Sequence, residues 1–186
     1  MHLIRKVYSR VNPYQGIRGL SIKVFNRDLK RKHREHALNI VDGQYYDYLR
    51  EESASNIVDR VEDITRSFPN ALELGSYRGT LYSHIASRES LRGAGGIGGI
   101  SELVQCDMAN SPEDLNDHMT EGIIPGLVQT SKLLYDEEGS FPFPDHSFDL
   151  VLSSLNLHWV NDLPTSLIRI KKVLKPDGAF IASMFG

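Results

Sequence analysis

The sequence predicts an α/β fold in which a parallel β-sheet is covered by helices on both faces. Short apolar runs alternate with segments of helical periodicity along residues 70–185, an alternation that indicates βαβ units. The runs are almost continuously apolar, as expected for strands buried on both faces. Composition agrees, because 40% of the 186 residues are apolar and 24% are charged, which is typical of a globular protein of about one domain.

Two helical segments are expected before the sheet. Residues 23–36 are densely charged behind one apolar pair and predict a short helix on the surface or on a partner. Within residues 45–67, apolar side chains recur at helical spacing from Ile57 to Ile64. Pro69 disfavours a helical conformation in the residue before it, so we expect the second helix to end near that point.

Five strands and three helices are expected after Pro69. The apolar runs predict strands over residues 70–75, 103–107, 128–135, 148–154 and 179–185. Helices are expected over residues 81–91 and over 163–174, the latter ending at a turn over 175–178. A third helix is expected to begin at Ser111, which would cap it, with Pro112 at the first helical position. Residues 93–99 are glycine-rich and predict a flexible loop.

The first 22 residues have the composition of a mitochondrial targeting segment. No acidic residue precedes Asp28, and the basic residues up to that point are Arg5, Lys6, Arg10, Arg18, Lys23 and Arg27. A basic, unstructured tail would have the same composition and is the alternative. No apolar run reaches the length of a membrane-spanning helix, so no transmembrane segment is expected. The single cysteine, Cys106, leaves no partner for an internal disulfide.

Polar residues follow the first three predicted strands. The loop Gly75–Gly79 would let a ligand approach the backbone, although such glycine pairs are also common in plain turns. Asp107 ends the second strand, where a carboxylate can accept both hydroxyls of a ribose or cap a helix. Residues 136–138, Asp-Glu-Glu, end the third strand and fit either an adenine amino group or a solvated charge cluster.

These stretches together resemble a known family. The segments ALELGSYRG, VQCDM, LLYDEEGSFPFPDHSFDLVLSSLNLHWVNDLP and VLKPDGAFIASMFG are similar to the successive motifs of class I S-adenosylmethionine-dependent methyltransferases. SSLNLHWVNDLP and FNRDLKRKHRE resemble a narrower group, the mitochondrial complex I assembly factor 5 family, whose members are described as methyltransferases or arginine hydroxylases. The resemblance implies a Rossmann-like three-layer sandwich over residues 68–186, preceded by a basic and helical extension over 23–67.

The resemblance also implies a site for S-adenosylmethionine. By position, the residues that match the family's cofactor contacts are Glu73, Gly75, Ser76, Gly79, Asp107, Met108, Asp136, Glu137, Ser154 and Leu155. The first four match the motif that holds the methionine part, Asp107 the ribose acid, Met108 the adenine neighbour, and Asp136 with Glu137 the adenine-side acids. The last two belong to Ser154–Leu157, which match the family segment that faces the cofactor sulfur. His158 and Trp159 follow, a pair that fits a substrate entrance or packing under the fourth strand. No catalytic base stands out, and no metal site is expected.

Two departures from the family pattern bear on activity. The family loop has a central glycine where this chain has Tyr77, and a bulky residue in a left-handed conformation is strained, so weaker cofactor binding is expected. The chain stops at Gly186, just after the fifth strand, so the sheet is expected to be incomplete and to expose an apolar edge at residues 180–185.

Two functions fit these observations. The first is an enzyme of the mitochondrial matrix, with peripheral association to the inner membrane as a further expectation, that uses S-adenosylmethionine and modifies an arginine of a respiratory complex I subunit. The second is a catalytically degenerate scaffold or assembly protein that docks through its basic stretch Lys30–Arg34. Nucleic-acid binding is not expected, because Glu35 and the acidic helix after it interrupt any extended basic face.

Overall fold

A computed structural model describes residues 23–40, 42–92, 97–109 and 128–186. The elements follow in the order α2 (Arg27–Leu38), η1 (Gly43–Tyr46), α3 (Tyr48–Glu62), β1 (Asn70–Leu74), α4 (Thr80–Arg92), η2 (Ile97–Gly99), β2 (Glu102–Asp107), β3 (Gln129–Leu134), β4 (Phe148–Ser154), η3 (Leu157–Trp159), α6 (Leu163–Val173) and β5 (Leu174–Ser183). The targeting segment predicted over residues 1–22 and the helix predicted from Ser111 lie outside the described residues.

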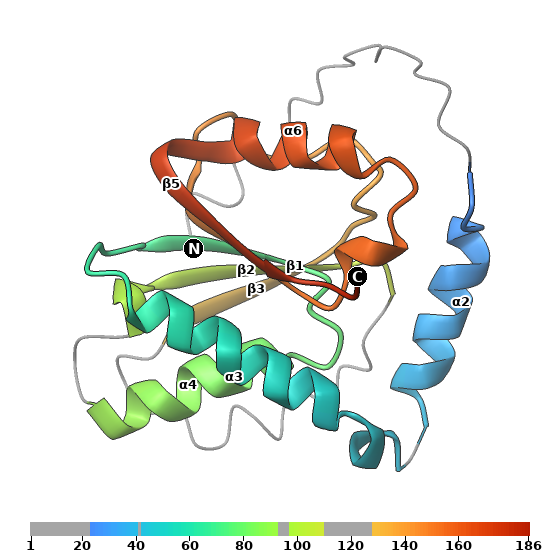
Figure 1. Ribbon diagram of the computed structural model, residues 1–186, viewed down its shortest axis with the longest axis horizontal. Helices are drawn as coiled ribbons and strands as arrows, with labels where there is room; N and C mark the ends of the chain where they lie inside the picture. The colour runs from blue at the N-terminus through green and yellow to red at the C-terminus, as the bar shows by residue number, and fades with distance from the viewer. Residues whose placement is uncertain (1–22, 41, 93–96, 110–127) are drawn as a thin grey trace.

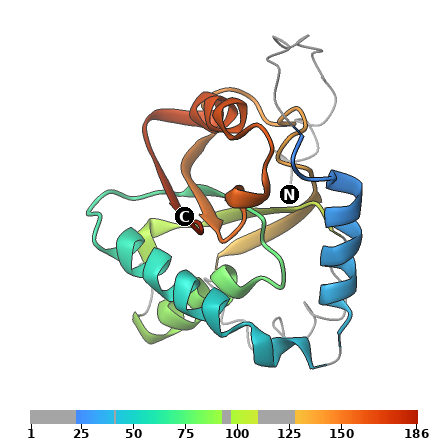
Figure 2. The same ribbon diagram turned by 45° about the vertical axis from the view of Figure 1, so that its right-hand side comes forward.

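The five strands form one parallel sheet in the order β3-β2-β1-β4-β5. Helices α3 and α4 cover one face and α6 covers the other, which confirms the predicted three-layer α/β arrangement (Figure 1). The strand order reverses between β1 and β4, and open sheets of this kind bind ligands beyond the carboxyl ends of the strands at such a reversal. Helix α2 stands beyond those carboxyl ends, apart from the two helical layers (Figures 1 and 2).

The core lies on both faces of the sheet because each strand alternates its side chains between them. Leu150 and Leu152 of β4 face the α3 and α4 side, whereas Val151 faces the α6 side, and all three are fully buried. Helix α3 contributes Ile57 and Val58 to the first of these clusters. Residues 48–62 therefore share one core with the strands.

Several boundaries differ from the sequence expectation. Helix α3 ends at Glu62 rather than near Pro69, because the chain then runs into the core, where Phe68 is buried and its N–H donates to the Gly98 carbonyl over 2.7 Å. The part of the predicted glycine loop that is described, Ile97–Gly99, is a 3-10 turn whose Ile97 is buried. Strand β5 starts at Leu174, earlier than expected, with an irregular register beside β4.

Strand β5 forms one edge of the described sheet. Phe180, Met184 and Phe185 near its end are exposed. Among the described residues, none of the helices has the length and apolar character needed to cross a bilayer.

Candidate functional site

The loop Gly75–Gly79 meets the segment after β4 at the reversal of strand order. Gly75 and Ser76 both donate their backbone N–H groups to the Cys106 carbonyl, at 2.7 and 3.1 Å, which draws the loop against the end of β2. Gly75 has φ +79°, and a Cβ there would lie 2.2 Å from the side-chain Cγ of Asn156. Because only glycine fits this backbone without displacing Asn156, the two loops approach closely enough to form one site.

Asp107 occupies the centre of the site at the carboxyl end of β2. Its Oδ2 accepts a hydrogen bond from the Tyr77 backbone N–H at 2.8 Å, and its Oδ1 accepts one from the Ala109 N–H at 2.9 Å. Its Oδ2 also accepts from Arg34 Nη2 at 2.5 Å, although both side chains are nearly buried. The carboxylate is therefore held in place by two backbone groups and paired with a cation from α2.

A second acidic group follows β3 and is paired in the same way. Arg27 donates to Asp136 through Nη2 at 2.7 Å and to the buried Glu137 at 2.6 Å. Burial works against the charge of Asp136, but the hydrogen bonds from Arg27 and from the Glu138 N–H outweigh it, and the pKa of Asp136 is lowered. Both predicted adenine-side acids thus face α2 and are paired with its Arg27.

Asn156 links the two acidic groups. Its Nδ2 donates to Glu137 Oε1 over 2.6 Å, and its Oδ1 accepts from Arg34 Nη1 over 2.5 Å. The side chain is buried, so the orientation of its amide is set by these two partners. Asn156 therefore connects the end of β3 to α2 through one amide.

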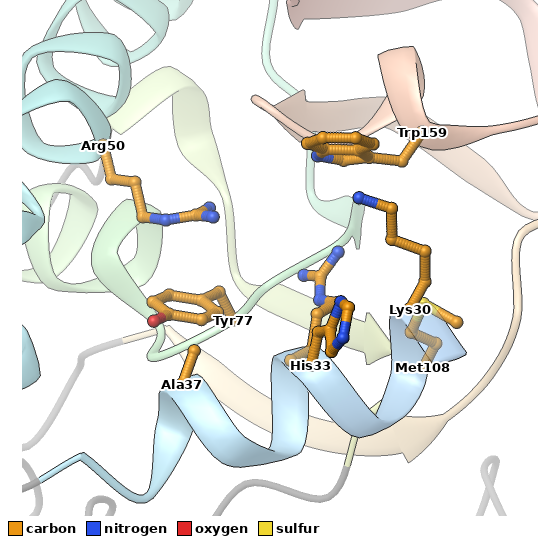
Figure 3. A pocket seen from close by; sticks show the side chains of 8 residues that line it. Lys30, His33, Ala37, Arg50, Tyr77, Met108 and Trp159 are labelled. Atoms are coloured by element: carbon orange, nitrogen blue, oxygen red, sulfur yellow. The ribbon is translucent and has the colours of Figure 1, made fainter. Parts of the chain in front are cut away.

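A cavity of about 170 Å³ lies between α2, the glycine loop and the ends of β2 and β4. Figure 3 shows its lining, which consists of Lys30, His33, Arg34, Ala37, Arg50, Tyr77, Met108 and Trp159. The Lys30 ammonium lies 2.9 Å from the centroid of the Trp159 ring, and the Arg50 guanidinium carbon lies 4.0 Å from that of Tyr77. Burial, followed by the charge of neighbouring arginines, lowers the pKa of both Lys30 and Arg50. The cavity is therefore cationic and aromatic.

Tyr77 adopts the strained conformation that its position suggests, with φ +51°. Its ring is buried between Leu38 of α2 and Ala109, beneath Arg50, and forms part of the cavity wall (Figure 3). The backbone strain is thus offset by packing against α2. Weaker cofactor binding because of Tyr77 stays a prediction.

The structure brings most predicted cofactor residues together but separates two. Gly75, Ser76, Asp107 and Met108 surround the cavity or its loop, with Gly79 at the end of that loop, and Asp136 and Glu137 lie alongside. Ser154 instead pairs its hydroxyl with Ser53 of α3 at 2.8 Å, and Leu155 lines a separate groove beside α3 and the end of β5. Contact of these two with a cofactor therefore stays a prediction.

Two further predicted residues are buried near the site. Glu73 is 1% exposed and accepts a hydrogen bond from Gln105 Nε2 at 2.8 Å. His158 lies between the rings of Trp159 and Phe185, and both of its ring nitrogens are buried without a hydrogen-bond partner among the described residues. Trp159 lines the cavity, which agrees with a substrate entrance, one of the two alternatives for the His158–Trp159 pair.

Three arginines of the site were not among the predicted cofactor contacts: Arg27, Arg34 and Arg50. The first two stand seven positions apart in α2, which places them on one helical face about two turns apart. That spacing indicates that the two arginines share a helical face, but it does not show which part of the protein this face contacts. The basic stretch Lys30–Arg34 was interpreted as a docking surface, whereas Arg34 contacts the chain's own Asp107.

Comparison with known proteins agrees with this geometry. A methyltransferase domain model matches residues 96–182. The chain is 42% identical over 182 residues to the mitochondrial arginine-hydroxylase NDUFAF5 of Homo sapiens and 41% identical to that of Rattus norvegicus; each alignment covers 98% of this chain and 48% of the relative. The chain thus spans about half the length of these curated relatives.

A solved structure shows the same fold. The N-methyltransferase NodS from Bradyrhizobium japonicum WM9, in complex with S-adenosyl-L-homocysteine, superposes with a TM-score of 0.57 at 18% identity. The superposition covers 82% of this chain and 71% of that one. At this identity the likeness concerns the fold alone.

Proposed function

Since this chain is a methyltransferase-fold protein related along nearly its whole length to the mitochondrial NDUFAF5 arginine hydroxylases, we propose that it binds S-adenosylmethionine and acts in mitochondrial complex I assembly. One observation carries the proposal. The glycine loop after β1, the carboxylate at the end of β2 and the acidic pair after β3 lie together at the carboxyl ends of the strands, beside the reversal of strand order, where Arg34 and Asn156 link the two acidic groups.

The residues present fit this cofactor. Asp107 would accept the ribose hydroxyls, because its carboxylate is oriented by two backbone N–H groups. Met108 would lie against the adenine, and Asp136 with Glu137 would lie near its amino group. Gly75, Ser76 and Gly79 would hold the methionine end through the backbone of their loop, although the Asn156 side chain fills the space directly beside the Gly75 Cα.

The chain's own contribution is binding and orientation. When bound, S-adenosylmethionine supplies an electrophilic methyl group, and transfer to a good nucleophile depends mainly on positioning and on exclusion of water. The glycine loop and Asp107 would orient the cofactor, and Trp159 with the end of α2 would separate it from solvent. Arginine hydroxylation is the activity named for the relatives, of which this chain spans about half the length. We propose it for the full-length protein and assign no step of it to the residues that the structure describes.

The cellular setting follows from the relatives. We propose the mitochondrial matrix as the location, with peripheral association to the inner membrane, and an arginine-bearing complex I subunit as the protein that is modified. A scaffold without catalysis is the second candidate. The observation in its favour is the ion pair between Arg34 and Asp107, which occupies the carboxylate that a cofactor would need.

Calorimetric titration with S-adenosylmethionine tests the proposal. We expect binding in the micromolar range, and we expect Asp107→Asn to weaken it about tenfold, because the substitution removes the charge from the acceptor of two hydroxyl hydrogen bonds. Asp63→Asn is the matched control, since Asp63 lies exposed at the end of α3, and it should leave the affinity unchanged. Undetectable binding by the native chain and by variants that free Asp107 would favour the scaffold.

A further inference from the structure

Helix α2 crosses the carboxyl ends of β2 and β3 with one face toward them. Arg27, Lys30 and Arg34 recur at intervals of three and four residues, so they share that face. Arg27 holds one end at Asp136 and Glu137, and the Arg78 guanidinium donates to the Ala37 carbonyl at the other end over 2.6 Å. Helix α2 is thus attached at both ends across the candidate site.

Arg34 lies between these attachments, on the carboxylate proposed to take the ribose. Asp107 Oδ1 already accepts from the Ala109 N–H, and Oδ2 accepts from both the Tyr77 N–H and Arg34. The other nitrogen of the same guanidinium donates to Asn156. A ribose whose two hydroxyls used both oxygens of Asp107 would have to take the place of Arg34, because Oδ2 already accepts two hydrogen bonds.

We propose that α2 is an internal competitor for the cofactor, in which Arg34 occupies the ribose position and must withdraw before S-adenosylmethionine binds. The inference rests on the proposed function and adds a regulatory step to it. A ligand that binds only the open arrangement shifts the population toward that arrangement, and its apparent affinity is reduced by the fraction of molecules in which α2 is seated.

The contacts of α2 are suited to reversible release. Leu38 is the buried residue of the helix, Ala37 packs partly beside it, and the other contacts of α2 are ion pairs, hydrogen bonds and the placement of Lys30 over the Trp159 ring. The N-terminus of the helix is capped internally, since the Asn26 side chain accepts from the Leu29 N–H. Segments with little apolar burial open at low free energy, so α2 can leave the site while the core of the sheet stays intact.

The positive charges of α2 also disfavour cofactor binding while the helix lies across the site. Lys30 and Arg34 both line the cavity, which Arg50 lines from the opposite side (Figure 3). S-adenosylmethionine carries a sulfonium charge, and like charges within a partly buried site repel each other. Withdrawal of α2 would remove two of these cations together with the steric block at Asp107.

Replacement of Arg34 tests the inference directly. We expect Arg34→Met, which keeps much of the side-chain volume without the charge, to bind S-adenosylmethionine about tenfold more tightly than the native chain in calorimetric titration. Lys32→Met is the matched control on the same helix, because Lys32 is exposed and does not line the cavity. Its affinity should equal that of the native chain.

Hydrogen exchange on the native chain gives an independent measurement. Saturating S-adenosylmethionine should reduce the protection of amides in residues 27–38 while that of β1 and β4 is kept or increased. Unchanged or weaker binding by Arg34→Met, or increased protection of α2 on binding, would overturn the inference while leaving the proposed cofactor in place. Failure of both the native chain and Arg34→Met to bind would instead remove the proposed function, and the inference with it.

Discussion

Alanine at Gly75 is expected to destabilise the protein by about 3–4 kcal/mol, whereas alanine at Gly79 is expected to cost only about 1 kcal/mol. Both glycines have positive φ, +79° and +78°, so both substitutions carry the same backbone strain. A Cβ on Gly75 would lie 2.2 Å from Asn156, while the nearest atom to a Cβ on Gly79 is 3.8 Å away on Gln105. The difference between the two variants therefore measures the close approach of the two loops.

Urea denaturation of the two variants and the native chain measures these free energies of unfolding. Asn156 bridges Glu137 and Arg34, so its displacement in Gly75→Ala should also loosen α2. A second variant, Gly75→Ala with Asn156→Gly, should recover part of the loss, because both the Asn156 amide and its Cβ, which would lie 2.5 Å from the new Cβ, are gone. Equal costs at the two glycines would contradict the proposed packing of the loop against Asn156.

The second large effect concerns Glu73, whose charge is unfavourable in the folded protein. Burial, partly opposed by the hydrogen bond from Gln105, raises the pKa of Glu73 to about 7 from an ordinary value of 4.5. Between these two pH values the folded protein binds more protons than the unfolded chain, so stability falls as the pH rises through this window. Above pH 7 the full cost is present, because the carboxylate is then charged in both states.

Glu73→Gln should therefore stabilise the protein by about 2–3 kcal/mol at pH 8 and by less than about 1 kcal/mol at pH 5. The glutamine keeps the shape, and its carbonyl oxygen can accept the same hydrogen bond from Gln105. Urea denaturation at both pH values measures the gain. Glu102→Gln, at an exposed position on the neighbouring strand β2, is the control and should show no comparable gain.

The two possible failures of this prediction have different meanings. An equal gain at both pH values would show that better packing, rather than loss of charge, stabilises the variant. A loss at pH 8 would show that the Glu73 carboxylate is stabilised in the folded state, for example through the charge of Lys132 on β3, which acts to lower its pKa. Either outcome would contradict the conclusion that the charge of buried Glu73, at the end of β1 before the glycine loop, destabilises the folded protein.

Much of the fold followed from local features of the chain. The run Phe148–Ser154 is apolar throughout because it is covered on both faces, and that property is visible in sequence. The acids Asp107 and Asp136 could be placed at one edge of the sheet, since parallel strands bring their carboxyl ends together. The predicted boundaries were less accurate for segments held by long-range contacts. Helix α3, for example, ends earlier than expected because the chain then runs to the buried Phe68.

The sequence by itself determined the parallel sheet, the positions of its polar strand ends and the resemblance to methyltransferases. Only the tertiary structure decided that Arg34 pairs with Asp107, 73 positions away, and that Ser154 faces α3. Helical spacing states which side chains share a face, but the surface that the face meets depends on how the whole chain packs. The raised pKa of Glu73 has the same origin, because burial is a property of the assembled fold and not of the residue.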